Sequence, residues 1–164
     1  MRLTPLRTIL IGVALLAIIG SSNAVRAARQ EDATAQRTEA RKWLYDGVHA
    51  YKNGQIEEAI DDFQHAKDLD PSLVNAQLYL ATAHSAHYIP GDPSPQNAQH
   101  GNQALQEFKD TLRAHSDNLS AIDGAGSILY NLAGTPFDPE KMEESKSYHQ
   151  RHIELRPGDP EPYY

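Results

Sequence analysis

Residues 43–71 read WLYDGVHAYKNGQIEEAIDDFQHAKDLDP and contain the pattern that decides the fold. Small and aromatic side chains recur here at helical spacing, because residues three and four apart share one face of a helix. Asn53-Gly54 is a turn dipeptide that predicts the end of a first helix, and Pro71 cannot continue a second one. Gly47 and Ala59 are small enough for two helices to cross closely. The stretch therefore predicts a tight helical hairpin.

The order of these residues resembles the tetratricopeptide repeat (TPR), a helix–turn–helix unit of about 34 residues. Counted from Ala40, six of the eight signature positions match, and they hold Trp43, Gly47, Ala59, Phe63, Ala66 and Pro71. The two departures are Asp46, where Leu is usual, and Ala50, where Tyr is usual. We interpret the six matching residues as packing residues. The resemblance implies a binding scaffold and not an enzyme.

Further helical patterns predict two more repeats, so that the first covers residues 39–72, the second 73–118 and the third 119–157. The second repeat contains an insertion at 88–95 that is rich in Pro and Gly and predicts a loop. Ser94-Pro95 and Asp138-Pro139 each resemble a helix N-cap followed by a first-turn proline. Ser145 and His149 replace the usual Ala and aromatic residue of the third repeat. We expect an all-α, TPR-type α-solenoid of about three helix–turn–helix repeats.

The N-terminal segment has the pattern of an export signal. Arg2 and Arg7 precede an apolar run over residues 9–19, and Ser22-Asn23-Ala24 supplies the small residues that a signal peptidase reads. The run is shorter than the ~20 residues that a membrane span requires. We therefore predict a signal peptide at 1–24, with an uncleaved N-terminal anchor as the alternative, and a flexible lead-in at 25–38. The expected location is periplasmic or extracellular.

Composition excludes several classes of function. The chain contains no cysteine, which rules out disulfides and thiol chemistry and favours a bacterial envelope protein over a disulfide-stapled secreted domain. Loss of Arg2 and Arg7 with the signal peptide reduces 15 basic side chains to 13 against 22 acidic ones, a formal charge near −9. Such a surface disfavours nucleic acid as a partner. A membrane is expected as a partner only if the N-terminal segment stays uncleaved.

Residues 158–164 resemble the start of a fourth, incomplete repeat, in which Tyr163 takes the position of Trp43. TPR arrays usually finish with a polar capping helix. Either the chain is a fragment of a longer repeat protein, or a partner or second copy covers this end. Self-association through the end of the last helix, which includes Ile153, is therefore an expectation.

The sequence contains histidine pairs and acidic pairs, but it lacks the sequence motifs that are typical of catalytic sites. His84 and His87 are three apart, as are His149 and His152, and such pairs share a helix face on which a metal ion can bind. No HExxH, GxSxG or phosphate-binding glycine loop accompanies them. We interpret these histidines as structural, and no cofactor or metal is predicted. The acidic pairs Glu57-Glu58 and Asp61-Asp62 are expected on a solvent-exposed helix face.

The TPR resemblance implies a concave groove lined by the first helix of each repeat. Read at the groove positions, the predicted partner-binding residues are Arg41, Leu44, Val48, Tyr51, Lys52, Asn75, Tyr79, Thr82, Asp123, Ser127, Tyr130 and Asn131; Leu78, Ser85 and Ser120 occupy further positions of the same set. TPR domains that grip a C-terminal carboxylate place Lys, Arg and Asn at five positions that here hold Leu44, Val48, Tyr79, Ser120 and Gly124. That clamp is therefore missing. A groove with hydroxyl groups and tyrosines suits an extended peptide or an amphipathic helix.

The sequence thus predicts a non-catalytic protein–protein interaction scaffold of the bacterial cell envelope. The alternative is a helical accessory domain, or a His-based metal-binding domain, of a larger envelope enzyme. The residues do not identify the protein partner.

Overall fold

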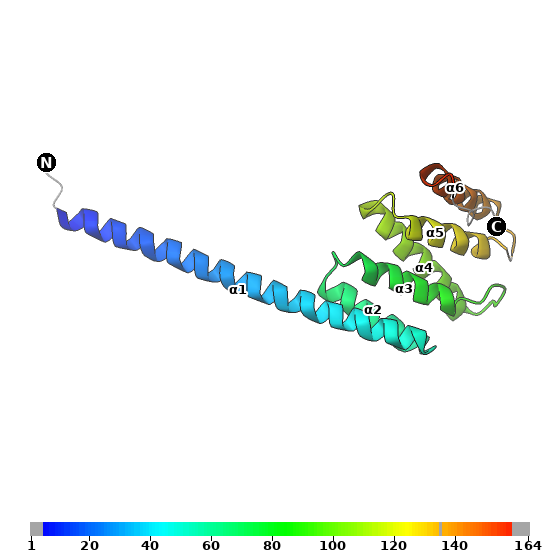
Figure 1. Ribbon diagram of the computed structural model, residues 1–164, viewed down its shortest axis with the longest axis horizontal. Helices are drawn as coiled ribbons and strands as arrows, with labels where there is room; N and C mark the ends of the chain where they lie inside the picture. Colours follow the sequence, from blue (N-terminus) through cyan, green and yellow to red (C-terminus); the bar gives the residue numbers. More distant parts are fainter. Residues whose placement is uncertain (1–4, 135, 159–164) are drawn as a thin grey trace. The chain divides into compact units, whose positions relative to one another are not determined.

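A computed structural model describes the backbone of residues 5–134 and 136–158, with side chains from residue 25 onward (Figure 1). The described part of the chain contains six helices and no strand: α1 (Pro5–Lys52), α2 (Ile56–Leu69), α3 (Val74–His87), α4 (Pro95–Ala114), α5 (Leu119–Leu132) and α6 (Pro139–Leu155). The fold is therefore all-α, as predicted. Of the helices whose residues the structure describes, none combines the length and the apolar character that a membrane span requires.

The chain forms two compact units, residues 1–38 and 39–164, and α1 contributes to both. Residues 25–38, where we expected a flexible lead-in, are helical, and every one of them is exposed. Their Ala, Arg, Gln and Glu residues are strong helix formers, which accounts for a helix without an apolar stripe. The predicted signal peptide includes residues 1–4, which lie outside the described residues. Most of the predicted start of a fourth repeat, residues 159–164, also lies outside them.

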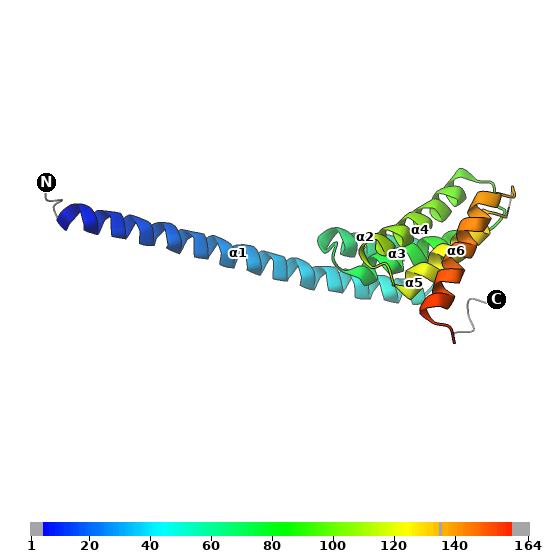
Figure 2. The ribbon, with the colours of Figure 1, turned by 90° about the horizontal axis from the view of Figure 1, so that it is seen from above.

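In the second unit the helices pack as successive antiparallel hairpins (Figures 1 and 2). Each of α2 to α5 contacts the next helix along the chain, and α3 also contacts α5. Two apolar clusters form the core. One centres on Phe63 and Leu80, and the other on Phe108 and Ile122. This is the neighbour-to-neighbour packing of a solenoid of about three helix–turn–helix repeats.

Small residues permit the close helix crossings. A Cβ atom at position 47 of α1 would lie 2.7 Å from the Phe63 ring of α2. At the corresponding crossing of α5 and α6, a Cβ atom at position 126 would lie 2.9 Å from His149. The buried Ser145 hydroxyl also donates to the Gly126 carbonyl at 2.8 Å. His149 and Ser145 thus fill the places of the aromatic residue and alanine that they replace.

The predicted helix boundaries are confirmed where local chemistry sets them. Gly54 has a φ of +77°, which is the left-handed conformation that glycine favours, and it lies between α1 and α2. The Ser94 hydroxyl accepts from the Asn97 amide at the start of α4, and the Asp138 carboxylate accepts from two amides at the start of α6. Pro95 and Pro139 each begin the helix that follows its cap.

The loop between α3 and α4 is held by one buried side chain. The Asn97 side chain accepts from the Ile89 amide at 2.6 Å and donates to the carbonyls of Ile89 and Asp92 at 2.8 and 2.9 Å. Asn97 is only 5% exposed, so these bonds satisfy a polar group that burial would otherwise leave without partners. The inserted segment is therefore tied to α4.

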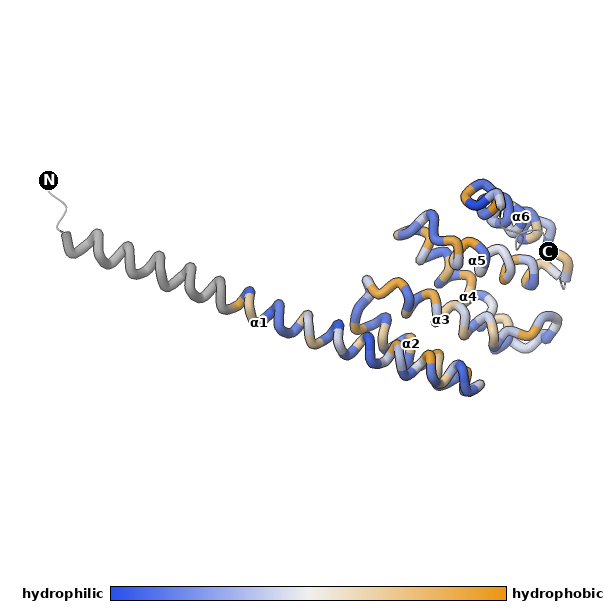
Figure 3. The backbone as a smooth tube through the Cα atoms, viewed as in Figure 1, coloured by the Kyte–Doolittle hydropathy of each residue, from blue (hydrophilic) through white to orange (hydrophobic). Residues whose placement is uncertain are grey.

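Most exposed side chains of α6 are polar, although Leu155 at its end is 45% exposed. Glu143, Lys146, Ser147, Gln150 and Glu154 are exposed, whereas Ile153 is partly buried, and Figure 3 shows most of the helix as hydrophilic. Self-association through this end stays a prediction.

Candidate functional site

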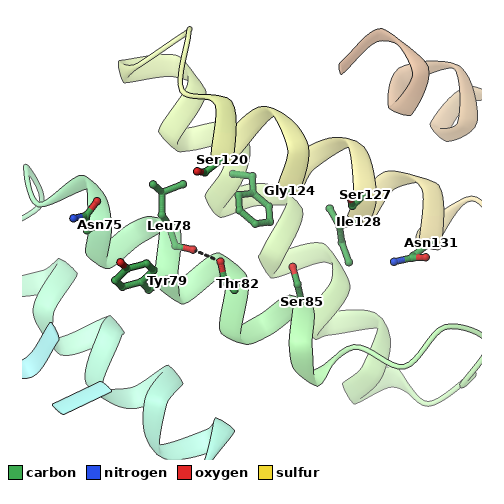
Figure 4. A pocket seen from close by; sticks show the side chains of 11 residues that line it. Asn75, Leu78, Tyr79, Thr82, Ser85, Ser120, Gly124, Ser127, Ile128 and Asn131 are labelled. Atoms are coloured by element: carbon green, nitrogen blue, oxygen red, sulfur yellow. Dashed lines mark hydrogen bonds between the residues drawn. The ribbon is translucent and has the colours of Figure 1, made fainter. Parts of the chain in front are cut away.

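A hollow of about 440 Å³ lies between the first helices of the second and third repeats (Figure 4). None of its lining side chains carries a charge. They are Asn75, Leu78, Tyr79, Thr82 and Ser85 of α3, Phe108 of α4, and Ser120, Gly124, Ser127, Ile128 and Asn131 of α5. The hollow therefore combines apolar surface with hydroxyl and amide groups.

The hydrogen bonds of these polar groups determine what they can offer a ligand. The Thr82 hydroxyl donates to the Leu78 carbonyl at 2.8 Å (Figure 4), and the Ser85 hydroxyl donates to the Ala81 carbonyl at 3.0 Å. Both hydroxyl oxygens therefore keep lone pairs for accepting a hydrogen bond. The side-chain amides of Asn75 and Asn131 both donate and accept. The hollow thus suits the alternating N–H and C=O groups of an extended peptide backbone.

A second hollow of about 250 Å³ continues the first toward α1. It is lined by Val48, Tyr51, Lys52, Phe63, Tyr79 and Thr82. Because Tyr79 and Thr82 line both hollows, the two form one groove, which we call the α1–α3–α5 groove. Lys52 contributes the single charge among its lining residues.

The groove brings together eight of the twelve residues named from the sequence. They are Val48, Tyr51, Lys52, Asn75, Tyr79, Thr82, Ser127 and Asn131. The other four lie elsewhere: Arg41 is exposed on α1, Leu44 packs against the core, Asp123 contacts His152 of α6, and Tyr130 is exposed on α5. Their role in binding stays a prediction.

Sequence reasoning missed three lining residues, Phe63, Phe108 and Ile128, because it considered only the outward positions of the first helices. Phe108 reaches the groove beneath Gly124, where a Cβ atom would collide with its ring. Tyr45 and Tyr79 occupy the position of Gly124 in the first two repeats. A glycine at the position that holds tyrosine in the first two repeats therefore indicated, in the sequence, that the groove opens over Phe108.

Three histidines meet on the other side of α3. The Nδ1 atoms of His84 and His100 are 3.1 Å apart, and the rings of His87 and His100 stack at 4.2 Å between centroids. Burial is the main cause that lowers the pKa of His84 to about 4, and His100 and His87 lower it further. Burial also lowers the pKa of His100. A neutral His84 packs at the α3–α4 contact with less cost than a charged one.

The second predicted histidine pair does not converge. His149 packs beneath Gly126, while the buried His152 pairs with Asp123 through its Nδ1 atom. Within the described residues, no group of three or more His, Asp or Glu side chains is arranged to hold a metal ion.

Comparison with known proteins identifies the fold. No family model matches the chain, and no curated protein matches its sequence. The first TPR domain of Spaghetti (RPAP3), solved with the HSP90 peptide SRMEEVD, is similar with a TM-score of 0.63 at 20% identity, over 77% of this chain and 86% of that one. The TPR domain of Arabidopsis OM64 is similar with a TM-score of 0.63 at 16% identity, over 78% and 91% of the two chains. A TPR protein of Thermus thermophilus is similar with a TM-score of 0.59 at 19% identity, over 72% and 57%.

The chain therefore has a TPR-type fold, as its sequence predicted. At these identities the likeness concerns the fold alone.

Proposed function

We propose that the chain is a protein–protein interaction scaffold that holds an extended peptide segment of a partner in the α1–α3–α5 groove. The observation that carries this proposal is the continuity of the groove through Tyr79 and Thr82. Two structural neighbours, the first and second TPR domains of RPAP3, were solved with HSP90 and HSP70 peptides. The fold is thus one in which a peptide can be bound.

The chemistry of the groove favours a segment without acidic groups. Those two neighbour peptides, SRMEEVD and SGPTIEEVD, are acidic. Here the positions of a carboxylate clamp hold Leu44, Val48, Tyr79, Ser120 and Gly124. A carboxylate taken into the hollow between α3 and α5, whose lining side chains are all neutral, would lose hydration without gaining a counter-charge. The partner segment in our proposal is therefore uncharged where it enters the hollow between α3 and α5.

We further propose that the scaffold acts in the bacterial cell envelope after removal of residues 1–24. The support is the sequence pattern of Arg2, Arg7, the apolar run and Ser22-Asn23-Ala24. N-terminal sequencing of the protein from cells tests this point, with Val25 as the expected first residue. A protein that begins at Met1 would favour the anchor instead.

Site-specific photo-crosslinking in cells tests the groove. A benzoylphenylalanine residue at Ser127, in the groove, is compared with one at Ser147, an exposed serine of α6 outside it. We expect a defined adduct from position 127 only, and a peptide from the captured protein should bind the purified chain and compete for the adduct. Equal adducts at both positions, or a captured peptide that does not bind, would contradict the proposal.

A further inference from the structure

Another hollow, of about 510 Å³, lies on the first helical hairpin and differs in charge from the groove. Three carboxylates line it, those of Asp46 on α1 and of Glu58 and Asp62 on α2. The rest of its wall consists of Trp43, Tyr45, His49 and Ala50 of α1 and of Gln55, which precedes α2. We call this feature the acidic hollow.

The acidic hollow arises where the first repeat departs from the TPR pattern. Asp46 stands in place of the usual Leu, and Ala50 in place of the usual Tyr, and both residues line the hollow. The small Ala50 side chain leaves space that a tyrosine ring would fill, and Asp46 brings a charge to that space. The two departures, four residues apart, thus lie on one face of α1 and create a single feature.

Asp62 is the least expected member of this set. We predicted an exposed side chain, but the residue is only 8% exposed, because its position on α2 faces α1. Neither Asp62 nor Asp46 makes a hydrogen bond or ion pair with another residue that the structure describes, whereas Glu58 accepts from Gln55 at 2.6 Å. A buried carboxylate normally has a hydrogen-bond donor or a cation in direct contact with it. The Asp62 carboxylate has neither among the described residues, and its oxygens are not sealed from the hollow.

The surroundings of Asp62 add to the cost of its charge. Burial is the first cause that raises its pKa, and the carboxylates of Glu58, Asp46 and Asp61 raise it further. His65 is the one neighbour that lowers it. A cation that enters the acidic hollow would give the Asp62 carboxylate a partner. It would also reduce the repulsion between the carboxylates.

The residues that line the hollow favour an organic cation over a metal ion. Metal ions need several donor atoms at one point, and no group of three His, Asp or Glu side chains in the described residues provides this. A guanidinium group is planar and larger, forms forked hydrogen bonds to carboxylates and stacks on aromatic rings. Tyr45 is 71% exposed, so its ring is available for such stacking.

We propose that the acidic hollow docks an arginine side chain of a partner protein, whose guanidinium group pairs with Asp62 and Asp46 and stacks on Tyr45. This surface is separate from the α1–α3–α5 groove and does not depend on the function proposed for it. The partner segment is basic here, in contrast to the uncharged segment expected in the groove.

The test uses the full chain labelled with ¹⁵N and two capped tripeptides, Gly-Arg-Gly and its neutral isostere Gly-citrulline-Gly. We expect the arginine peptide to shift the amide signals of Asp46, Glu58 and Asp62, and the citrulline peptide to leave them unchanged. Asp62→Asn should weaken arginine binding about fivefold, the effect of one partly exposed ion pair. Asp68→Asn removes the same charge from an exposed site of α2 outside the hollow and should leave the affinity unchanged.

Melting curves of both variants establish that each is folded before binding is compared. The proposal is overturned if the arginine peptide does not shift these signals, or if the citrulline peptide shifts them equally. Equal losses in Asp62→Asn and Asp68→Asn would show that net charge alone attracts the peptide, and would also overturn it. So would displacement of the peptide by millimolar Ca²⁺ or Mn²⁺ at constant ionic strength, because the hollow would then be a metal site.

Discussion

Gly47 shows at the scale of one residue why the helical hairpin requires a glycine. A side chain there would meet the Phe63 ring, which is 2% exposed and packed in the core. We expect Gly47→Leu to lower the free energy of unfolding by about 3 kcal/mol through overpacking. Urea unfolding followed by circular dichroism measures the change. Ala98→Leu adds similar bulk at an exposed position of α4 and should stay within about 0.5 kcal/mol of the parent; equal effects would contradict this explanation.

Asp62 gives a prediction with a defined pH dependence. Burial, then Glu58 and Asp46, raise its pKa above the ordinary value of 3.8. Its contribution to stability is therefore complete below pH 3.8 and is lost as the pH rises through the raised pKa of the folded protein. Asp62→Asn stays neutral and should melt at a higher temperature than the parent at pH 7, with no advantage near pH 3. The exposed Asp68→Asn controls for net charge, and a lower melting temperature of Asp62→Asn at pH 7 would contradict the argument.

At the scale of elements, the α3–α4 loop depends on Asn97. Asn97→Ala would remove three hydrogen bonds to the backbone of Ile89 and Asp92 and leave those groups without that partner. We expect a loss of about 2 kcal/mol and faster proteolytic cleavage between residues 88 and 94. Asn102→Ala, at an exposed position of α4, should change neither quantity. Cleavage in the loop at the parent rate would show that Asn97 does not order it.

Local chemistry explains which elements the sequence predicted well. Three signals operate within a few residues of the chain: the turn glycine at position 54, the capped prolines at 95 and 139, and the helical spacing of apolar residues. They are sufficient to predict where α2, α4 and α6 begin. The burial of Asp62, the meeting of His84 with His100, and the opening over Phe108 depend on which helices pack together. Periodicity within one helix does not contain that information. The groove followed from the TPR resemblance, whereas the acidic hollow required the structure.

At the scale of the whole molecule, α3 and α4 lie in the middle of the array and link its two ends. Glu107 of α4 accepts from Lys67 of α2 at 2.6 Å and from Gln77 of α3 at 3.2 Å, so one carboxylate joins three helices. Because each repeat of a solenoid packs only on the adjacent repeats, loss of a central contact separates the two ends. Events at the α3–α4 contact should therefore affect the unfolding of the entire array.

His84 makes that central contact sensitive to acid. Burial, then His100 and His87, lower its pKa from 6.5 to about 4. The unfolded chain thus binds a proton at a higher pH than the folded one, and stability that is present above pH 6.5 is lost as the pH falls toward 4. We expect the midpoint of thermal unfolding to fall by several degrees between pH 7 and pH 4.5, as one cooperative transition. His84→Gln should flatten this profile, because glutamine does not titrate, whereas the exposed His115→Gln should keep it. Parallel profiles for the parent and His84→Gln would assign the acid sensitivity to groups outside the α3–α4 contact.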